Sequence, residues 1–194
     1  MDPDLPLLRA LQDGNESALN ELIARHQGSL FHFALNYLRD ETAAREVVQE
    51  TFVRTYFKAA RFQPRAAVKT WIYAIALNLC RDQARGIARR RRMVPLEPDG
   101  GDRRECAPVD PQAAPDEQAG LQDQLSALQR AIDALPHCLR EALVLFSIEG
   151  RSQKEAAEIL GTTPKTVELR VHRAKEKLRR LMVGREGPAV GGQK

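Results

Sequence analysis

The sequence of this 194-residue chain predicts an all-α fold made of two small helical domains joined by a flexible linker. Apolar side chains recur every three or four residues through most of the chain, which is the period of an α-helix. No segment alternates apolar and polar residues as a half-buried strand does, and only 5% of the residues are aromatic. A proline-rich stretch over residues 93–120 interrupts the helical pattern and separates the two domains.

The N-terminal domain, residues 5–92, is expected to contain four helices. Gly14 should end the first, and leucine and phenylalanine repeat at helical spacing in the second. Pro64 breaks the pattern between the third helix and the fourth. Because the connections are short, these helices should form a compact bundle. They are expected over residues 5–13, 17–38, 41–60 and 66–88.

Residues 93–120 carry five prolines and seven acidic side chains but few large apolar ones. Such a segment cannot bury enough apolar surface to fold on its own, so we expect a flexible acidic linker. The C-terminal domain covers residues 121–182, and the glycine-rich tail over 183–194 is expected to be disordered. Helices of this domain are expected over residues 121–135, 136–149, 152–160 and 164–182.

Positive charge is concentrated in two blocks of the chain. Residues 54–92 hold eleven basic side chains and a single acid, Asp82, and residues 151–182 hold nine basic side chains against four acids. The formal net charge is only +4, because the N-terminal segment and the linker are acidic. Two basic blocks separated by an acidic spacer predict two separate contacts with a polyanion.

The composition argues against a metal centre, a cofactor site or a membrane anchor. Cys80, Cys106 and Cys138 form no CxxC pair, and no histidine lies at ligand spacing from them, so neither a zinc site nor a disulfide framework is expected. We also find no cofactor motif. The chain shows neither a signal-peptide pattern nor an apolar run long enough for membrane insertion, which predicts a cytoplasmic protein.

A helix-turn-helix motif is predicted over residues 152–181. Ser152 and Glu155 have the spacing of a capping box, Gly161 supplies the turn, and Thr163 can cap the second helix. One side of that second helix is apolar and the other is basic, which suits entry into a DNA major groove. An ordinary amphipathic helix pair with solvated charges is the alternative. The basic residues are Lys165, Arg170, Arg173, Lys177 and Arg180.

The predicted fourth helix carries a second polar stripe at spacings of three and four residues. An asparagine can bond a base edge through two hydrogen bonds, and arginines anchor phosphates. The preceding loop, RFQPR at residues 61–65, combines cations with an aromatic ring that could stack on an unpaired base. Phe62 and Trp71 are, in the alternative, core residues. The stripe consists of Asn78, Arg81, Asp82 and Arg85, extended by Arg89–Arg92.

Three segments follow one another in the chain: ETAAREVVQETFVRTY, then RFQPRAAVKTWIYAIALNLCRDQARGIARRRR, then LPHCLREALVLFSIEGRSQKEAAEILGTTPKTVELRVHRAKEKLRRL. Together they resemble an extracytoplasmic-function sigma factor of bacterial RNA polymerase, in the sigma-70 family. The resemblance covers about residues 15–182. It implies sigma domain two in the N-terminal half and sigma domain four, with the helix-turn-helix, in the C-terminal half.

The resemblance also implies partners and site residues. The partners are core RNA polymerase, through its β′ clamp and β flap, together with promoter DNA and an anti-sigma protein; no enzymatic activity is implied. Docking on the clamp would use Glu46, Gln49, Glu50 and Arg54. Reading and melting of the −10 element would use Arg61, Phe62, Gln63, Asn78, Arg81, Asp82 and Arg85. Reading of the −35 element would use Lys165, Thr166, Glu168, Leu169, Arg170, His172, Arg173 and Lys177.

Two departures from the family pattern bear on these roles. Arg45-Glu46 stands where many members have a pair of acids, which would alter docking on the polymerase. Glu168 and Leu169 stand where members often have a basic and a small residue. Glu168 could accept a hydrogen bond from cytosine, and Leu169 could contact a thymine methyl group, so the resemblance does not determine the −35 sequence that this chain reads.

Two other classes of function are the alternatives to a sigma factor. One is a helix-turn-helix transcriptional regulator with an N-terminal sensory or dimerisation domain, which would have no need of the stripe at Asn78. The other is an enzyme, but no paired carboxylates, nucleophile–base set or phosphate loop supports it. The isolated His26, His32 and His137 suit structural roles. A linker between two DNA-reading domains further predicts weak promoter binding by the free chain.

Overall fold

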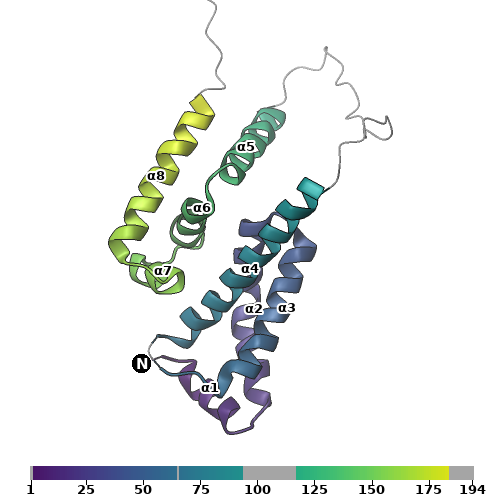
Figure 1. Cartoon of the computed structure of the whole chain (residues 1–194), viewed down its shortest axis with the longest axis vertical. Coiled ribbons are helices and arrows are strands. Elements are labelled where there is room, and N and C mark those ends of the chain that lie inside the picture. The colour runs from purple at the N-terminus through teal and green to yellow at the C-terminus, as the bar shows by residue number, and fades with distance from the viewer. Residues whose placement is uncertain (1, 65, 94–116, 184–194) are drawn as a thin grey trace, which may run out of the picture.

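The computed structural model describes residues 2–64, 66–93 and 117–183, and every regular element in these ranges is helical (Figure 1). The predicted all-α class is confirmed. Most of the predicted linker and tail lies outside the described residues. In chain order the elements are α1 (Leu5–Gln12), α2 (Ser17–Leu38), α3 (Glu41–Ala59), α4 (Val68–Met93), α5 (Glu117–Asp133), α6 (His137–Leu143), the π-helical turn η1 (Val144–Ile148), α7 (Gln153–Leu160) and α8 (Pro164–Val183).

The N-terminal half is a bundle of α2, α3 and α4 with α1 packed across one end (Figure 1). Its apolar faces meet in a core where the rings of Phe33 and Tyr73 lie 5.5 Å apart. Burying an aromatic side chain of this size contributes roughly 1.5–3 kcal/mol to stability. The largest fully buried side chains here are Leu8, Leu22, Leu30, Phe33, Tyr37, Val47, Val68, Ile72, Tyr73 and Leu77.

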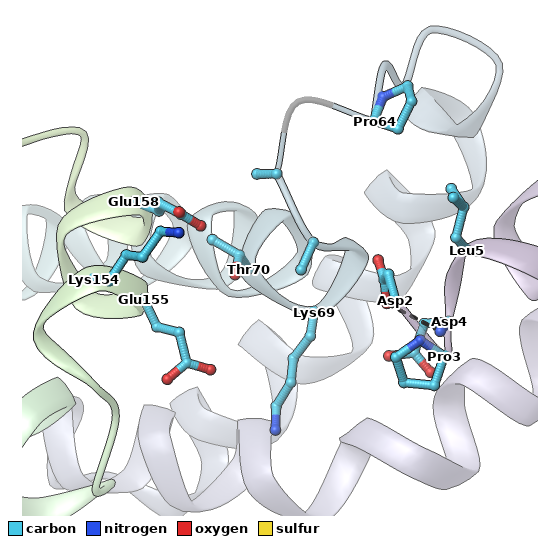
Figure 2. Close-up of a pocket in the computed structure, with 12 residues that line it drawn as sticks. Asp2, Pro3, Asp4, Leu5, Pro64, Lys69, Thr70, Lys154, Glu155 and Glu158 are labelled. Carbon is cyan, nitrogen blue, oxygen red and sulfur yellow. Dashed lines mark hydrogen bonds between the residues drawn. The ribbon is translucent and has the colours of Figure 1, made fainter.

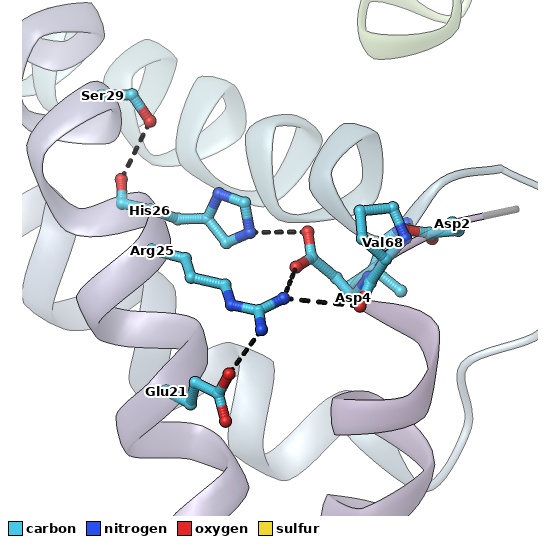
Figure 3. A network of polar contacts seen from close by, with 8 residues as sticks. Asp2, Asp4, Glu21, Arg25, His26, Ser29 and Val68 are labelled. Carbon is cyan, nitrogen blue, oxygen red and sulfur yellow. Dashed lines mark hydrogen bonds and ion pairs between the residues drawn. The ribbon is translucent and has the colours of Figure 1, made fainter.

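The segment before α1 is attached to the bundle by its two aspartates. The Asp2 carboxylate accepts a 2.7 Å hydrogen bond from the backbone N–H of Val68, so it caps the first turn of α4. Asp4 is buried and accepts from His26 Nε2 at 2.7 Å and from Arg25 at 3.1 Å (Figure 3). The structural role expected for His26 is therefore confirmed.

The C-terminal half contains the predicted helix-turn-helix in α7 and α8. Ser152 and Glu155 form the capping box, because the hydroxyl accepts from the Glu155 N–H while that carboxylate accepts from the Ser152 N–H at 3.0 Å. Gly161 has a φ of +63°, a left-handed conformation that glycine adopts without strain. Thr163 accepts from the N–H of Thr166 at 3.2 Å and begins α8 as predicted.

Replacing Ser152 with alanine is expected to lower the free energy of unfolding by about 1 kcal/mol, because a capping oxygen is lost. Hydrogen bonds from Ser152 also hold the pKa of Glu155 below its ordinary value of 4.5. The capping box therefore stabilises the fold above that pH and loses this contribution as the pH falls through the lowered pKa. Urea unfolding should show a smaller difference between variant and parent at about pH 3 than at about pH 7. An equal or larger difference at the lower pH would contradict the ionic part of this account.

The helix expected over residues 136–149 does not continue as a single α-helix. It changes at Val144 into the π-helical turn η1. Such a local widening of a helix occurs frequently at functional sites. Directly after this turn, Glu149 accepts from Asn36 of α2 at 3.0 Å. The guanidinium of Arg151 lies 4.2 Å from the ring centre of Tyr73 in α4.

The two halves are packed against each other, which the tethered arrangement expected from the sequence did not predict. Figure 1 shows α7 beside α4, and α2 contacts η1 on the same side of the bundle. Buried residues of both halves, among them Leu145 and Ala157 with Ile72 and Tyr73, belong to one continuous apolar cluster. The described structure is therefore a closed form, in which the helix-turn-helix rests on the N-terminal bundle.

Candidate nucleic-acid interface

The predicted stripe on α4 is only partly exposed. Asn78, Asp82 and Arg85 face solvent, whereas Leu79 and Cys80 between them are buried in the core. Asn78 Oδ1 accepts a hydrogen bond from Arg81 at 3.2 Å, and Asp82 lies 3.5 Å from the Arg85 guanidinium. The exposed part of the stripe can thus present an amide and a cation to a nucleic acid.

Arg81 departs from the prediction of a side chain directed at DNA. Its Nε and Nη2 each donate to Glu141 of α6 at 2.7 Å, a bidentate pair with a carboxylate that is only 4% exposed. This hydrogen bonding raises the pKa of the Arg81 guanidinium above its ordinary value. The reason is tertiary: the packing of η1 and α7 on the bundle brings the buried Glu141 carboxylate to Arg81, which neutralises it.

The loop before α4 combines a half-buried ring with free polar side chains. Phe62 packs against Trp71 with ring centres 4.9 Å apart, so this ring belongs to the edge of the core as well as to the loop. Arg61 and Gln63 beside it are exposed. Of the three loop residues predicted to receive an unpaired base, Phe62 is therefore the only one whose side chain is partly covered by other residues.

The outer face of α8 carries the second predicted set. Val167, Val171 and Ala174 are buried on the inner face, which leaves the polar side chains on the other side, as the periodicity predicted. Leu169 is 48% exposed in the middle of this polar surface. Thr166 is half-buried and its hydroxyl pairs with Thr163 at 2.9 Å, and Arg170 is half-buried. The exposed members are Lys165, Glu168, Leu169, His172, Arg173 and Lys177.

The four residues predicted to bind a protein partner lie together on α3. Glu50 Oε1 accepts from Arg54 Nε at 2.7 Å, and Glu46 accepts from Gln83 of α4 at 3.3 Å. Glu46, Gln49 and Glu50 line a groove of about 420 Å³ between α3 and α4. Leu79 and Gln83 of α4 complete its lining, and no residue of the stripe on α4 or of the α8 face is part of it.

Comparison with known proteins places these surfaces in a family. The model of Sigma-70 region 2 matches residues 22–91, and that of Sigma-70, region 4 matches residues 125–178. The RNA polymerase sigma factor CnrH of Cupriavidus metallidurans is 32% identical over 93% of this chain and 95% of CnrH. The ECF RNA polymerase sigma factor SigE of Mycolicibacterium smegmatis is 32% identical over 86% of this chain and 63% of SigE. The chain belongs to the extracytoplasmic-function (ECF) sigma factors of the sigma-70 family.

The fold of this sigma factor is also found among solved structures. A chain in the structure of CnrH in complex with the cytosolic domain of CnrY superimposes with a TM-score of 0.68 at 28% identity, over 94% of this chain and 99% of that chain. The α3 and α4 surfaces lie within the region 2 match, and the α8 face lies within the region 4 match. As a sigma factor, the protein is a transcription initiation factor of RNA polymerase.

An apolar surface of this sigma factor, beside the acidic face of α3, was not predicted from the sequence. Phe57 is 74% exposed, and Val53 and Tyr56 are also exposed. Together with Leu19 and Ile23 of α2 they line a groove of about 450 Å³. The available signal was the density of apolar residues in α3, which exceeds what one helix face can bury. The lining residues are Leu19, Ile23, Gln27, Val48, Gln49, Phe52, Val53, Tyr56 and Phe57.

Two classes of feature are absent from the described residues of this sigma factor. Within them, no group of three or more histidine, cysteine, aspartate or glutamate side chains could hold a metal ion. None of the described helices has the length and apolar character needed to cross a membrane. Cys80 is buried and Cys138 is exposed, and neither is in a disulfide.

Proposed function

We propose that this sigma factor directs core RNA polymerase to promoters through two DNA-reading surfaces, one on α4 for the −10 element and one on α8 for the −35 element. The main support for the proposal is a pair of exposed polar helix faces, one in each sigma-70 region, with Asn78 and Arg85 on α4 and Lys165, Arg173 and Lys177 on α8. Acting through binding and DNA melting, the chain catalyses no reaction itself. Its site of action is the cytoplasm, where promoter DNA and polymerase are found.

On α8, the exposed side chains divide into two roles. Arg173 and Lys165 carry charge that can bond a guanine edge or a phosphate, and Leu169 between them offers an apolar contact for a thymine methyl group. Glu168 repels phosphate and accepts hydrogen bonds, so it favours a cytosine at its position. This combination predicts a −35 preference that is set by Glu168 and Leu169.

Docking on polymerase is assigned to α3. The carboxylates of Glu46 and Glu50 would face a basic partner surface, and the exposed Val53 and Phe57 would bury apolar area beside them. CnrH has been solved with the cytosolic domain of CnrY. By analogy, an anti-sigma protein would hold this chain inactive by covering the surfaces that the polymerase needs.

A selection experiment tests the proposal against a regulator that uses only the helix-turn-helix. Core polymerase reconstituted with the chain is mixed with duplexes in which both promoter elements and the DNA between them are randomised. Bound and transcribed duplexes should share two sequence blocks at a fixed separation. A single block, selected equally well without core polymerase, would contradict the proposal and support the regulator.

Arg173→Ala is expected to weaken binding of the holoenzyme to the selected −35 block by ~1–3 kcal/mol if Arg173 reads a base. The exposed position on α8 makes a folding defect unexpected, because alanine is a good helix former. Competition binding against duplexes mutated at each −35 position measures the loss. A uniform loss at every sequence, with a shallower salt dependence, would instead make Arg173 a phosphate contact.

A further inference from the structure

We propose that Arg81 and Glu141 form a latch that closes the free sigma factor on itself and withholds Arg81 from promoter DNA. The latch joins α4 of the N-terminal half to α6 of the C-terminal half. Its consequence for DNA rests on the proposed −10 role of Arg81, whereas its existence can be tested without DNA. Within the stripe on α4, Arg81 is thus paired with the other half of the same chain, whereas Asn78, Asp82 and Arg85 stay exposed.

The latch is built around one buried carboxylate. Both oxygens of Glu141 accept from Arg81 at 2.7 Å, and the Tyr37 hydroxyl of α2 donates to Oε1 at 3.4 Å. A carboxylate that is 4% exposed is strongly disfavoured without such partners. All of these partners belong to the N-terminal half. When the halves part, Glu141 regains water, so its partners are needed only in the closed form.

Two further contacts between the halves follow the π-helical turn η1. Asn36 donates to Glu149 at 3.0 Å, and Arg151 stacks over the Tyr73 ring at 4.2 Å. These polar contacts reinforce the latch from the neighbouring turn. They also orient α6 and η1 on α2 and α4, which keeps Glu141 opposite Arg81.

An open cleft borders the apolar contact between the two halves, so the halves are joined over only part of their facing surfaces. Figure 2 shows Lys154, Glu155 and Glu158 of α7 on one side of this cleft, with Lys69 and Thr70 of α4 on the other. The cleft has a volume of about 630 Å³ and is lined by charged side chains. A charged, water-accessible edge costs little to separate, which suits an interface that must open.

The latch and DNA reading compete for the same donors. Arg81 uses Nε and Nη2 on Glu141 and Nη1 on Asn78, which also occupies the Asn78 acceptor. The guanidinium cannot hold Glu141 in this bidentate geometry and bond a phosphate or a base with the same nitrogens. The apparent DNA affinity is then the intrinsic affinity multiplied by the fraction of molecules that are open. Closure should therefore weaken promoter binding by the free chain, in addition to the effect expected from the linker over residues 93–120.

Distance measurement on the full chain tests the latch itself. Spin labels are placed on Cys138 and on a cysteine introduced at the exposed position Asn20, in a Cys106→Ser background. Burial raises the pKa of the Cys80 thiol to about 12, so it should stay unlabelled. Glu141→Arg should lengthen the mean separation by about one helix diameter, roughly 10 Å, or more. Adding Arg81→Glu to Glu141→Arg should restore the short distance, because the swapped pair can close again.

Three outcomes of this arm overturn the latch: a long distance in the parent chain, no change in Glu141→Arg, or no restoration by the charge swap. Circular dichroism and thermal unfolding of each variant separate opening from misfolding, since the swap must recover the distance in a folded protein. None of these readouts involves DNA. If the proposed promoter-reading function proves wrong, the distance measurements still decide whether the latch exists.

A DNA arm tests the consequence. The probe is a fluorescent single strand that carries the −10 block obtained by selection, bound to the free chain. Glu141→Gln should raise its affinity by up to tenfold, which corresponds to about 1.4 kcal/mol, if nine molecules in ten of the parent are closed. Glu21→Gln makes the same charge change at an exposed helix position of the N-terminal half and should have no such effect. Equal affinities of Glu141→Gln and the parent would overturn the claim that closure withholds Arg81.

Discussion

Reversing the charge of Glu50 is expected to reduce binding of core polymerase by tenfold or more, the scale of a central interface residue at about 2 kcal/mol. Glu50 lies in the groove between α3 and α4 beside Glu46 and Gln49, and its carboxylate pairs with Arg54 at 2.7 Å. In Glu50→Lys the pair becomes a repulsion between two cations one helical turn apart. The surface also loses the negative charge that should face a basic partner.

Pull-down or surface-binding assays with purified core polymerase measure this effect. Asp13→Lys provides a matched control, because it adds the same charge at an exposed position at the end of α1. The control should bind as the parent does, and both variants should keep their affinity for DNA. Undiminished polymerase binding by Glu50→Lys would show that this face of α3 does not dock on the polymerase.

Asn78→Ala is expected to slow open-complex formation by a factor that corresponds to ~1–3 kcal/mol, the range for a lost bidentate base contact. Asn78 is exposed on α4, and alanine is the better helix former, so the fold should be unaffected. The change also removes the acceptor that Arg81 Nη1 uses at 3.2 Å. Polymerase binding should be unchanged, because Asn78 does not line the groove that we propose for docking.

Permanganate reactivity of thymines in the −10 region reports this melting step. Reactivity should appear more slowly with Asn78→Ala than with the parent, and Asn20→Ala, an exposed asparagine on α2, should behave as the parent. Equal melting by Asn78→Ala and the parent would show that this amide does not read the −10 element.

The parts of the fold that depend on neighbouring residues were predictable from the sequence. The capping box of Ser152 and Glu155, the left-handed Gly161 and the cap at Thr163 all depend on chemistry within three or four residues. Hydrophobic periodicity placed α2 and α8 within one or two residues of their observed ends. Local rules therefore predicted the helix-turn-helix correctly before any packing was known.

Contacts between distant residues were not predictable in this way. Glu141 and Arg81 are 60 positions apart, and nothing near Glu141 marks it as a buried acid rather than a solvated one. The carboxylate of Asp2 caps a helix that begins 66 positions later. Likewise, periodicity could identify the apolar residues of α3 but not that Val53, Tyr56 and Phe57 face solvent. Which faces are covered is decided by tertiary packing alone.

The closed form joins these observations into one account of the sigma factor. The face of α8 and the surface of α3 proposed for docking stay exposed, whereas Arg81 of the stripe proposed to read the −10 element is held by Glu141. Polymerase that binds both halves at a promoter would supply the free energy to separate them, since it offers each half a better partner. Promoter reading would then depend on the assembled holoenzyme rather than on the free chain.

Reconstituted transcription would show whether this sigma factor reads a promoter through two surfaces. Core polymerase is combined with the chain on a duplex that carries the two selected sequence blocks, and run-off RNA is quantified. RNA of a single length should appear only when both the chain and both blocks are present. RNA formed equally well without the chain, or with either block scrambled, would contradict the account of a two-surface promoter reader.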